Sequence, residues 1–204
     1  MTENTVLSID PSLSSTGFCI RKGVEIASLG RITTSSKQAE PDRLFAITRQ
    51  ISSLIETYGV TEVVLEDQFL NMNTKRMNVK TLMILSHVRG VIMALAGQHA
   101  LKLCSYSPST IKKVVTGNAH ASKEEVRRQI KVLHKGSALV IQTLERKGKT
   151  DDISDALAID WTHLQQRKDR EACNMVSKGR HKRHGGITIQ RTRKVGYRIS
   201  KGQQ

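Results

Sequence analysis

Three short stretches near the N-terminus combine β-branched and apolar residues, at residues 5–9, 16–21 and 26–34. Such composition is typical of strands, and the break at Lys22-Gly23 is a turn signal between the second and third stretch. The pattern therefore predicts an antiparallel meander of three strands.

The spacing of apolar residues then changes to a helical period. From Pro41 the apolar positions recur every three or four residues until Gly59, which predicts a helix that ends at this glycine. A further strand is expected over 61–65. The segment 78–96 is apolar on nearly all sides, so a helix there needs cover on more than one face. It is either a core helix or a helix that forms a dimer.

The second half predicts one more strand and three helices, in the order 101–106 (strand), 108–117, 123–134, and a last helix opening at Asp151 or Asp152. Ser107-Pro108 supplies a cap and a first-turn proline, and Ser122 with Glu125 forms a capping box. Residues 135–150 are predicted to be a loop with at most one helical turn. Five strands alternating with helices predict an α/β fold with a mixed sheet.

The charge of the chain indicates a polyanionic partner. The 204 residues contain 33 Lys and Arg against 18 Asp and Glu, a formal net charge of +15. This excess is far beyond what solubility needs, and nucleic acid is the simplest explanation. The hydrophobic content of 38% and its periodicity argue for a globular body rather than general disorder.

Basic residues are concentrated at the C-terminal end. From Lys178 onward the sequence has nine Lys and Arg and no Asp or Glu. We therefore expect one domain over residues 1–170 and a basic extension over 171–204. The extension is either a flexible arm or a small hairpin, because Ile187, Ile189 and Val195 belong to an alternating pattern.

Cysteine usage and the absence of a leader bear on the compartment. Cys19, Cys104 and Cys173 are odd in number and widely spaced, without metal-binding motifs. No uninterrupted apolar run of about 20 residues and no basic-then-apolar leader occur, so we expect no membrane partner. A cytoplasmic location, in a bacterial cell or a phage-infected host cell, is expected.

Acidic residues stand at the ends of three predicted core elements. Asp10 ends the first strand, Glu66 ends the fourth, and Asp152 and Asp155 open the last helix. Carboxylates at strand ends converge on one rim of a sheet, and positions i and i+3 share a helix face. Such hard oxygen ligands suit Mg²⁺ or Mn²⁺, and two ions can promote phosphodiester hydrolysis.

Each acid also has an ordinary structural explanation. Asp10 can cap the turn before Pro11, Glu66 can simply end a strand, and Asp151 or Asp152 can cap a helix. Their shared position at element ends is what favours a metal pocket. The positions of the residues alone do not decide whether Asp151 or Asp152 belongs to this metal pocket.

Four segments in register resemble the RuvC family of Holliday junction resolvases: IDPSLSSTGFCI at 9–20, LEDQF at 65–69, TIKKVVTG at 110–117 and DDISDALAI at 151–159. The resemblance covers about residues 5–165. It implies an RNase H-like mixed sheet of five strands flanked by helices, with the basic tail added. The chain would be a divergent or phage-type member.

The resemblance also implies roles for individual residues. Its D-x-x-D spacing selects Asp152 over Asp151, so that Asp10, Glu66, Asp152 and Asp155 become the catalytic acids and metal ligands, with Asp151 left as a helix cap. Phe69 matches an aromatic residue that contacts a base, while Lys112 and Lys123 resemble two lysines that bind the scissile phosphate region. A core phenylalanine and a solvated helix face are the structural alternatives for these three.

The implied activity is Mg²⁺-dependent cutting of four-way junctions by a homodimer, with two ions per site and 5′-phosphate ends. Forks and flaps are further expected substrates. Ser8 and Ser12 replace glycines of the family pattern, so the first turn can differ. The alternatives are a non-enzymatic architectural protein that binds branched nucleic acid and an actin-like phosphotransferase, against which the length of the chain argues.

Overall fold

The computed structural model describes residues 4–67, 79–146 and 150–181, with side chains described as far as residue 172. Residues 1–167 form one compact unit, and residues 168–204 are assigned to a second. The basic segment after residue 181 lies outside the described residues, so its expected form stays a prediction.

Five strands form one sheet: β1 (Thr5–Asp10), β2 (Ser15–Lys22), β3 (Glu25–Thr33), β4 (Glu62–Glu66) and β5 (Lys102–Tyr106). Their order across the sheet is β3-β2-β1-β4-β5. The first three strands pair antiparallel, whereas β4 runs parallel to both β1 and β5. The predicted meander and mixed sheet are both confirmed, and the central strands β1 and β4 are the most buried.

Six helices follow from the described residues: α1 (Glu40–Tyr58), α2 (Val79–Gln98), α3 (Pro108–Thr116), α4 (Lys123–Leu133), α5 (Ala138–Glu145) and α6 (Asp151–His181). Helix α1 ends at Gly59, which adopts a left-handed conformation, and the capping box of Ser122 and Glu125 opens α4 as predicted. Helix α5 corrects the prediction of a loop over 135–150. Ser137 caps it, and Val140 and Leu144 are buried.

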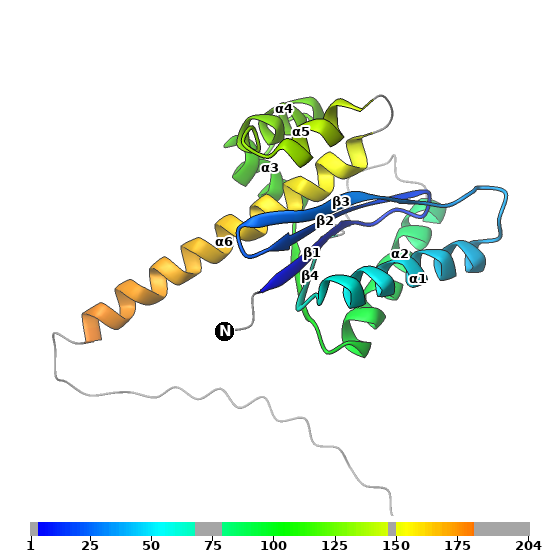
Figure 1. Ribbon diagram of the computed structural model, residues 1–204, viewed down its shortest axis with the longest axis horizontal. Helices are drawn as coiled ribbons and strands as arrows, with labels where there is room; N and C mark the ends of the chain where they lie inside the picture. Colours follow the sequence, from blue (N-terminus) through cyan, green and yellow to red (C-terminus); the bar gives the residue numbers. More distant parts are fainter. Residues whose placement is uncertain (1–3, 68–78, 147–149, 182–204) are drawn as a thin grey trace, which may run out of the picture. The chain divides into compact units, whose positions relative to one another are not determined.

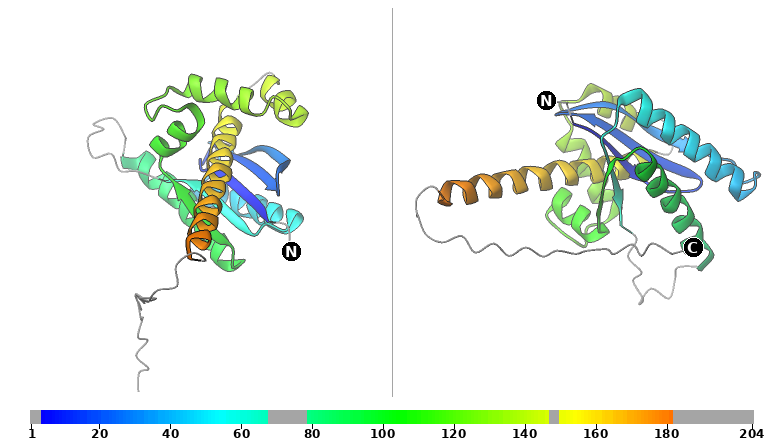
Figure 2. Two further views of the ribbon diagram at one scale, coloured as in Figure 1. Left: turned by 90° about the vertical axis from the view of Figure 1, so that its left-hand side faces the viewer. Right: turned by 90° about the horizontal axis from the view of Figure 1, so that it is seen from below.

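The helices cover both faces of the sheet, as Figures 1 and 2 show. Helices α1 and α2 pack on one face around a core that includes Leu7, Ile9, Val63 and Leu65. Helices α3 to α6 pack on the other face around Val6, Val64 and their neighbours. Alternate residues of β1 and β4 thus enter opposite cores, as the period of a strand requires.

Helix α2 has a buried face and an exposed apolar face. Val88, Ile92 and Leu95 are buried, whereas Val79 and Met83 are 69% and 55% exposed. The sequence predicted that other residues pack on more than one side of this helix. Within the described part of the chain, no residues pack on its exposed apolar face. By length and composition alone, α2 is also able to cross a membrane, but the core helices of soluble proteins pass the same test.

A buried ion pair fastens α6 to the sheet. Arg21 on β2 and Asp160 on α6 are 5% and 1% exposed, and the guanidinium donates to both carboxylate oxygens. A further guanidinium nitrogen donates to the carbonyl oxygen of Val24 at 2.7 Å. Because both charges are desolvated, each one requires the other to remain in the core.

Breaking this pair is expected to destabilise the fold strongly. Arg21→Met leaves the Asp160 carboxylate buried without its partner, which we expect to lower the free energy of unfolding by about 3–5 kcal/mol. Urea denaturation followed by circular dichroism measures the change. Arg127→Met, which removes the more exposed pair with Asp151, is the control and should cost less than about 1 kcal/mol. Equal effects of the two substitutions would contradict the expectation.

Candidate active site

The register of the two central strands brings two of the predicted acids together. Ile9 of β1 pairs with Leu65 of β4 in parallel. Asp10 and Glu66, the next residue of each strand, therefore lie at the same edge of the sheet. Both side chains are half-buried. The common rim that the sequence predicted for these two carboxylates is present.

Helix α6 delivers the other two acids to this rim. Asp10 pairs across the sheet with Gly17 of β2, and a Cβ atom built on Gly17 would lie 1.9 Å from the backbone oxygen of Asp152. Only a residue without a side chain permits this approach. Ser15 of β2 also donates a hydrogen bond to the Asp152 carboxylate at 2.5 Å. Asp155 follows three positions later on α6, and its charge reaches Asp10 and Glu66.

Burial and mutual repulsion disfavour ionisation of these carboxyl groups. Burial, followed by the charges of Asp155 and Glu66, raises the pKa of Asp10 to about 8. Burial likewise raises the pKa of Glu66, with the charge of Asp155 acting in the same direction. Burial is also the main cause that raises the pKa of Asp155. Like charges held close together out of water have this effect.

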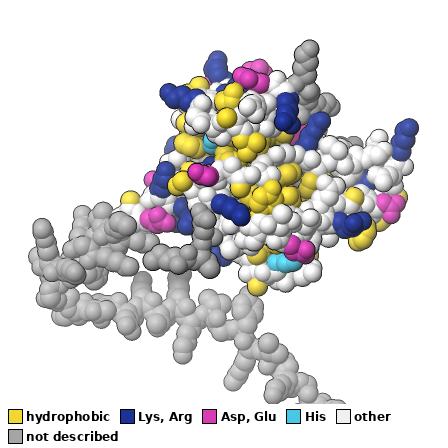
Figure 3. Space-filling model, in the orientation of Figure 1, with side chains coloured by type: hydrophobic (Ala, Val, Ile, Leu, Met, Phe, Trp, Pro, Cys, Tyr) yellow, Lys and Arg dark blue, Asp and Glu magenta, His cyan; other side chains and the backbone are white. Residues whose placement is uncertain are grey.

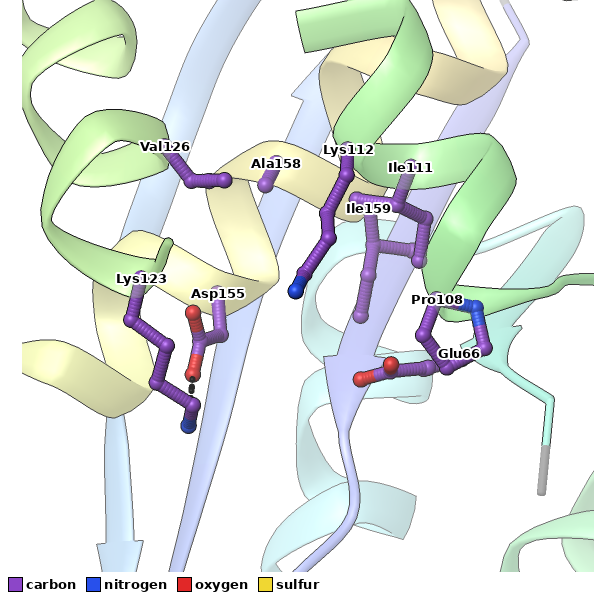
Figure 4. Close-up of a pocket in the computed structure, with 9 residues that line it drawn as sticks. All are labelled: Glu66, Pro108, Ile111, Lys112, Lys123, Val126, Asp155, Ala158 and Ile159. Carbon is purple, nitrogen blue, oxygen red and sulfur yellow. Dashed lines mark hydrogen bonds and ion pairs between the residues drawn. The ribbon is translucent and has the colours of Figure 1, made fainter. Parts of the chain in front are cut away.

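Two lysines face the acids across a pocket of about 150 Å³ that is lined in part by Glu66 and Asp155. Figure 4 shows Lys112 from α3 and Lys123 from α4 extending toward these carboxylates. The Lys123 ammonium lies 3.4 Å from an Asp155 oxygen, and the charge of Asp155 raises the pKa of this lysine. Both predicted lysines are therefore beside the predicted acids.

The neighbouring Asp151 has a different environment. Its carboxylate accepts a hydrogen bond from Arg127 of α4 at 2.7 Å, and its side chain is 66% exposed. Helix α6 begins at Asp151, so this residue belongs to the first turn and is not the cap that was expected. The contact with Ser15 distinguishes Asp152, the residue that the family spacing selected, from its neighbour.

The set of donors fits a hard divalent cation. Four carboxylates offer only oxygen ligands, the type that Mg²⁺ and Mn²⁺ prefer. Three of them have raised pKa values because they lie near one another with partial burial. A bound cation would reverse this shift by stabilising the ionised forms.

Sequence reasoning missed several residues that shape the site. Ser15 and Gly17 were not singled out, although both lie within the segment that resembles the family. Arg89 of α2 donates to the backbone oxygen of Glu66 and lies 3.2 Å from the Asp67 carboxylate. Such contacts depend on tertiary packing and have no local signal. Phe69, the predicted base contact, lies outside the described residues.

Comparison with known proteins gives one family. Residues 6–163 match the family described as "Crossover junction endodeoxyribonuclease RuvC". The protein of that name from Alkaliphilus metalliredigens is 35% identical over 162 residues, which are 78% of this chain and 91% of that protein. The protein from Rickettsia conorii is 34% identical over 163 residues, covering 78% and 96% respectively.

Solved structures show a common fold. Thermus thermophilus RuvC in complex with a Holliday junction substrate matches with a TM-score of 0.65 at 21% identity, over 79% of this chain and 93% of that one. The yeast mitochondrial Holliday junction resolvase Ydc2 matches with a TM-score of 0.59 at 16% identity, over 85% of each chain. The predicted RNase H-like fold is thereby confirmed.

A methyl group on Gly17 is expected to separate the acids. Because Gly17→Ala would push the backbone of α6 at Asp152 away from β2, we expect metal-supported DNA cleavage to fall on the order of 100-fold. Cleavage rates and circular dichroism of the purified variant test this. Gly136→Ala is the matched control, since this glycine is exposed and a Cβ there meets nothing within 4 Å. An active Gly17→Ala variant would refute the proposed close approach.

The pKa of Asp10 predicts how the stability of the metal-free protein depends on pH. The folded chain holds a proton on Asp10 up to a pKa of about 8, whereas the unfolded chain loses it near its usual value of about 4. The contribution of Asp10 to the free energy of unfolding is therefore fully present below about pH 4, and it is lost as the pH rises to about 8. Asp10→Asn should raise the unfolding free energy at pH 8.5 by a few kcal/mol, on the order set by this shift.

Chemical denaturation in EDTA at pH 5 and pH 8.5 measures this effect. The gain from Asp10→Asn should be larger at pH 8.5 than at pH 5, and added Mg²⁺ should stabilise the unsubstituted protein more than the variant. Asp42→Asn, at an exposed position of α1, is the control. If the gain in unfolding free energy did not change with pH, the pKa of Asp10 would not be raised in the folded protein.

Proposed function

The chain belongs to the RuvC family of crossover junction endodeoxyribonucleases, and we propose that it is a metal-dependent endonuclease that resolves four-way DNA junctions. The observation that carries this proposal is the meeting of four carboxylates at one rim of the sheet with two lysines beside them. Such an arrangement can hold a cation and a phosphodiester together. DNA recombination, repair or replication is the proposed context, in the cytoplasm of a bacterial or phage-infected cell.

Asp10, Glu66, Asp152 and Asp155 are the proposed metal ligands and catalytic acids. Two Mg²⁺ ions, or Mn²⁺ in their place, would supply an activated water and neutralise the leaving oxygen of the DNA backbone. Ser15 holds the Asp152 carboxylate in place through its hydrogen bond. Hydrolysis on these lines is proposed to leave 5′-phosphate ends, which a ligase can rejoin.

Lys112 and Lys123 are proposed to bind the phosphate groups that flank the cut. Both line the pocket that contains Glu66 and Asp155. On the face in Figure 3, further Lys and Arg side chains lie over the upper part of the molecule, where Figure 1 has α3 to α5. Neutralisation of phosphates by these cations would add affinity without sequence preference. Phe69 is proposed to stack on a base near the crossover.

The exposed apolar face of α2 supports a homodimer. Val79, Met83 and Met93 are each about half or more exposed on this helix, and Phe45 of α1 is 64% exposed. A second copy would bury these side chains and provide the second site that paired nicking of a junction requires. We propose that α2 contributes to this interface.

Light scattering should give twice the 22.7 kDa mass of one chain. Met83→Asp places a charge in the proposed interface and should shift the protein toward the monomer, because an unpaired charge is costly to bury. Lys131→Asp on α4 is a control for the added negative charge at a distant surface. A monomer at all concentrations, or a dimer unaffected by Met83→Asp, would exclude this interface.

The alternative is an architectural protein that binds branched nucleic acid without cutting it, which the charge of +15 alone would also fit. An incubation of the protein with labelled DNA, in Mg²⁺ or in EDTA, distinguishes the two functions. The DNA substrates are a four-way junction, a fork, a flap and a linear duplex. We expect cleavage of the junction with Mg²⁺ only, and a loss of at least about 1000-fold in rate for Asp10→Asn because a ligand charge is removed. Asp42→Asn should cut normally.

The same assay separates the finer parts of the proposal. Binding of the junction without cleavage under any metal condition would favour the architectural function. Equal cutting of junction and linear duplex would remove the resolvase assignment and keep the nuclease. Ligation of the nicked product by DNA ligase without prior phosphorylation reports the 5′-phosphate end.

A further inference from the structure

A second cluster of metal-ligating residues lies on the same sheet face as the acids, between the start of β4 and the middle of β5. Glu62 begins β4 and Glu66 ends it, so their positions are separated by about 13 Å of strand. Cys104 of β5 pairs with Val64, the residue midway between the two glutamates. His163 lies on α6, two turns after Asp155. The cluster therefore has no residue in common with the proposed active site.

The three side chains converge closely. The Cys104 thiol donates to one Glu62 oxygen at 3.2 Å, and the other Glu62 oxygen lies 3.5 Å from Nε2 of His163. The candidate ligand atoms of Glu62, Cys104 and His163 all lie within 4.8 Å of one another. These atoms come from two strands and one helix, so the convergence is set by the fold and not by a flexible loop.

The histidine is held with one nitrogen directed into the cluster. The Tyr106 hydroxyl lies 3.0 Å from Nδ1 of His163. Nε2 of the same ring is buried, and its described neighbour is the Glu62 oxygen at 3.5 Å, a long ion-pair contact rather than a well-formed hydrogen bond; the histidine is only 2% exposed. Buried polar atoms are rarely left in this state, because an unmade hydrogen bond in the interior is costly. A proton shared with Glu62 or a bound cation would satisfy it.

We propose that Glu62, Cys104 and His163 form a metal site for a borderline-soft divalent cation such as Zn²⁺, distinct from the four-carboxylate site. Imidazole nitrogen, thiolate sulfur and carboxylate oxygen are the ligand types of zinc, and three of them leave a fourth position open. The sulfur and nitrogen donors disfavour Mg²⁺, which prefers oxygen. The two sites therefore select different ions by ligand chemistry.

Tyr106 favours this role, and Arg167 opposes it. Tyr106 is a positioning residue, since a hydrogen bond to the outer nitrogen of a metal-bound histidine fixes the ring and its tautomer. The hydrogen bond from the Cys104 thiol holds the Glu62 carboxylate toward the cluster. The positive charge of Arg167 also acts on the Glu62 carboxylate, and it opposes the approach of a cation.

Binding requires a single proton transfer besides ligation. The Cys104 S–H bond breaks as the sulfur–metal bond forms, and the proton passes to solvent; no electrons are gained or lost. His163 binds as neutral imidazole with its Nδ1 proton donated to Tyr106. The result would be a clamp that joins β4 and β5 to α6 at a point about two turns along the helix from Asp155. Such a clamp stabilises the folded chain, and the stabilisation grows with the logarithm of the free cation concentration once this exceeds the dissociation constant.

Cobalt is a spectroscopic probe for this site, because a thiolate ligand gives Co²⁺ a charge-transfer absorption in the near ultraviolet that oxygen ligands do not. The full chain, freed of metal and kept reduced, is titrated with Co²⁺ in excess Mg²⁺, which occupies the four-carboxylate site. We expect this band to saturate at one equivalent per chain. It should persist in Asp10→Asn and be lost in Cys104→Ser. No band in the folded protein, or a band retained in folded Cys104→Ser, would overturn the proposal.

A second measurement needs no substitution and covers the case in which Cys104→Ser does not fold. The thiols of the unsubstituted protein are alkylated with and without one equivalent of Zn²⁺, and each cysteine is followed by mass spectrometry. Zn²⁺ should slow alkylation of Cys104 at least tenfold, with Cys173 as the internal reference. Equal rates at Cys104 in both conditions would overturn the proposal, whether or not the chain cuts DNA.

Discussion

The contact between the backbone of α6 and the backbone of β2 at Gly17 sets the geometry of the whole site. A Cβ atom at Gly17 would overlap the backbone of Asp152, so the helix can approach only where the strand has no side chain. Gly17 is also the register partner of Asp10. One position on β2 therefore determines how close the helix acids come to the strand acids. The Arg21–Asp160 pair then anchors the same helix farther along the same strand.

This close approach has an electrostatic cost that the rest of the structure offsets. Burial and neighbouring charges raise the pKa values of Asp10, Glu66 and Asp155. The charges of Lys123 and Lys112, which lie beside these acids, partly oppose the rise in the pKa of Glu66. The rigid core holds together groups that would otherwise move apart. Sites that bind cations commonly have this character, since function requires an arrangement that is unfavourable when the ion is absent.

Sequence reasoning predicted the sheet and the acids at its rim, because strand ends and helix caps have strong local signals. It missed α5, an eight-residue helix that is capped by Ser137 directly after Gly136 and is too short to show a clear helical period. It did not find Arg21–Asp160, whose partners are 139 residues apart. The choice of Asp152 over Asp151 needed the family spacing. The contacts of Ser15 and Arg127 with these two residues could be recognised only in three dimensions.

The parallel pairing of Ile9 with Leu65 also limits how such a gene can vary. An insertion or deletion of one codon within β1 or β4 would turn every later side chain of that strand to the opposite face. It would turn one acid to the face opposite the other, and it would exchange the side chains of that strand between the two cores. Changes in length are therefore expected between the elements, while the strands themselves can accumulate substitutions only at constant length.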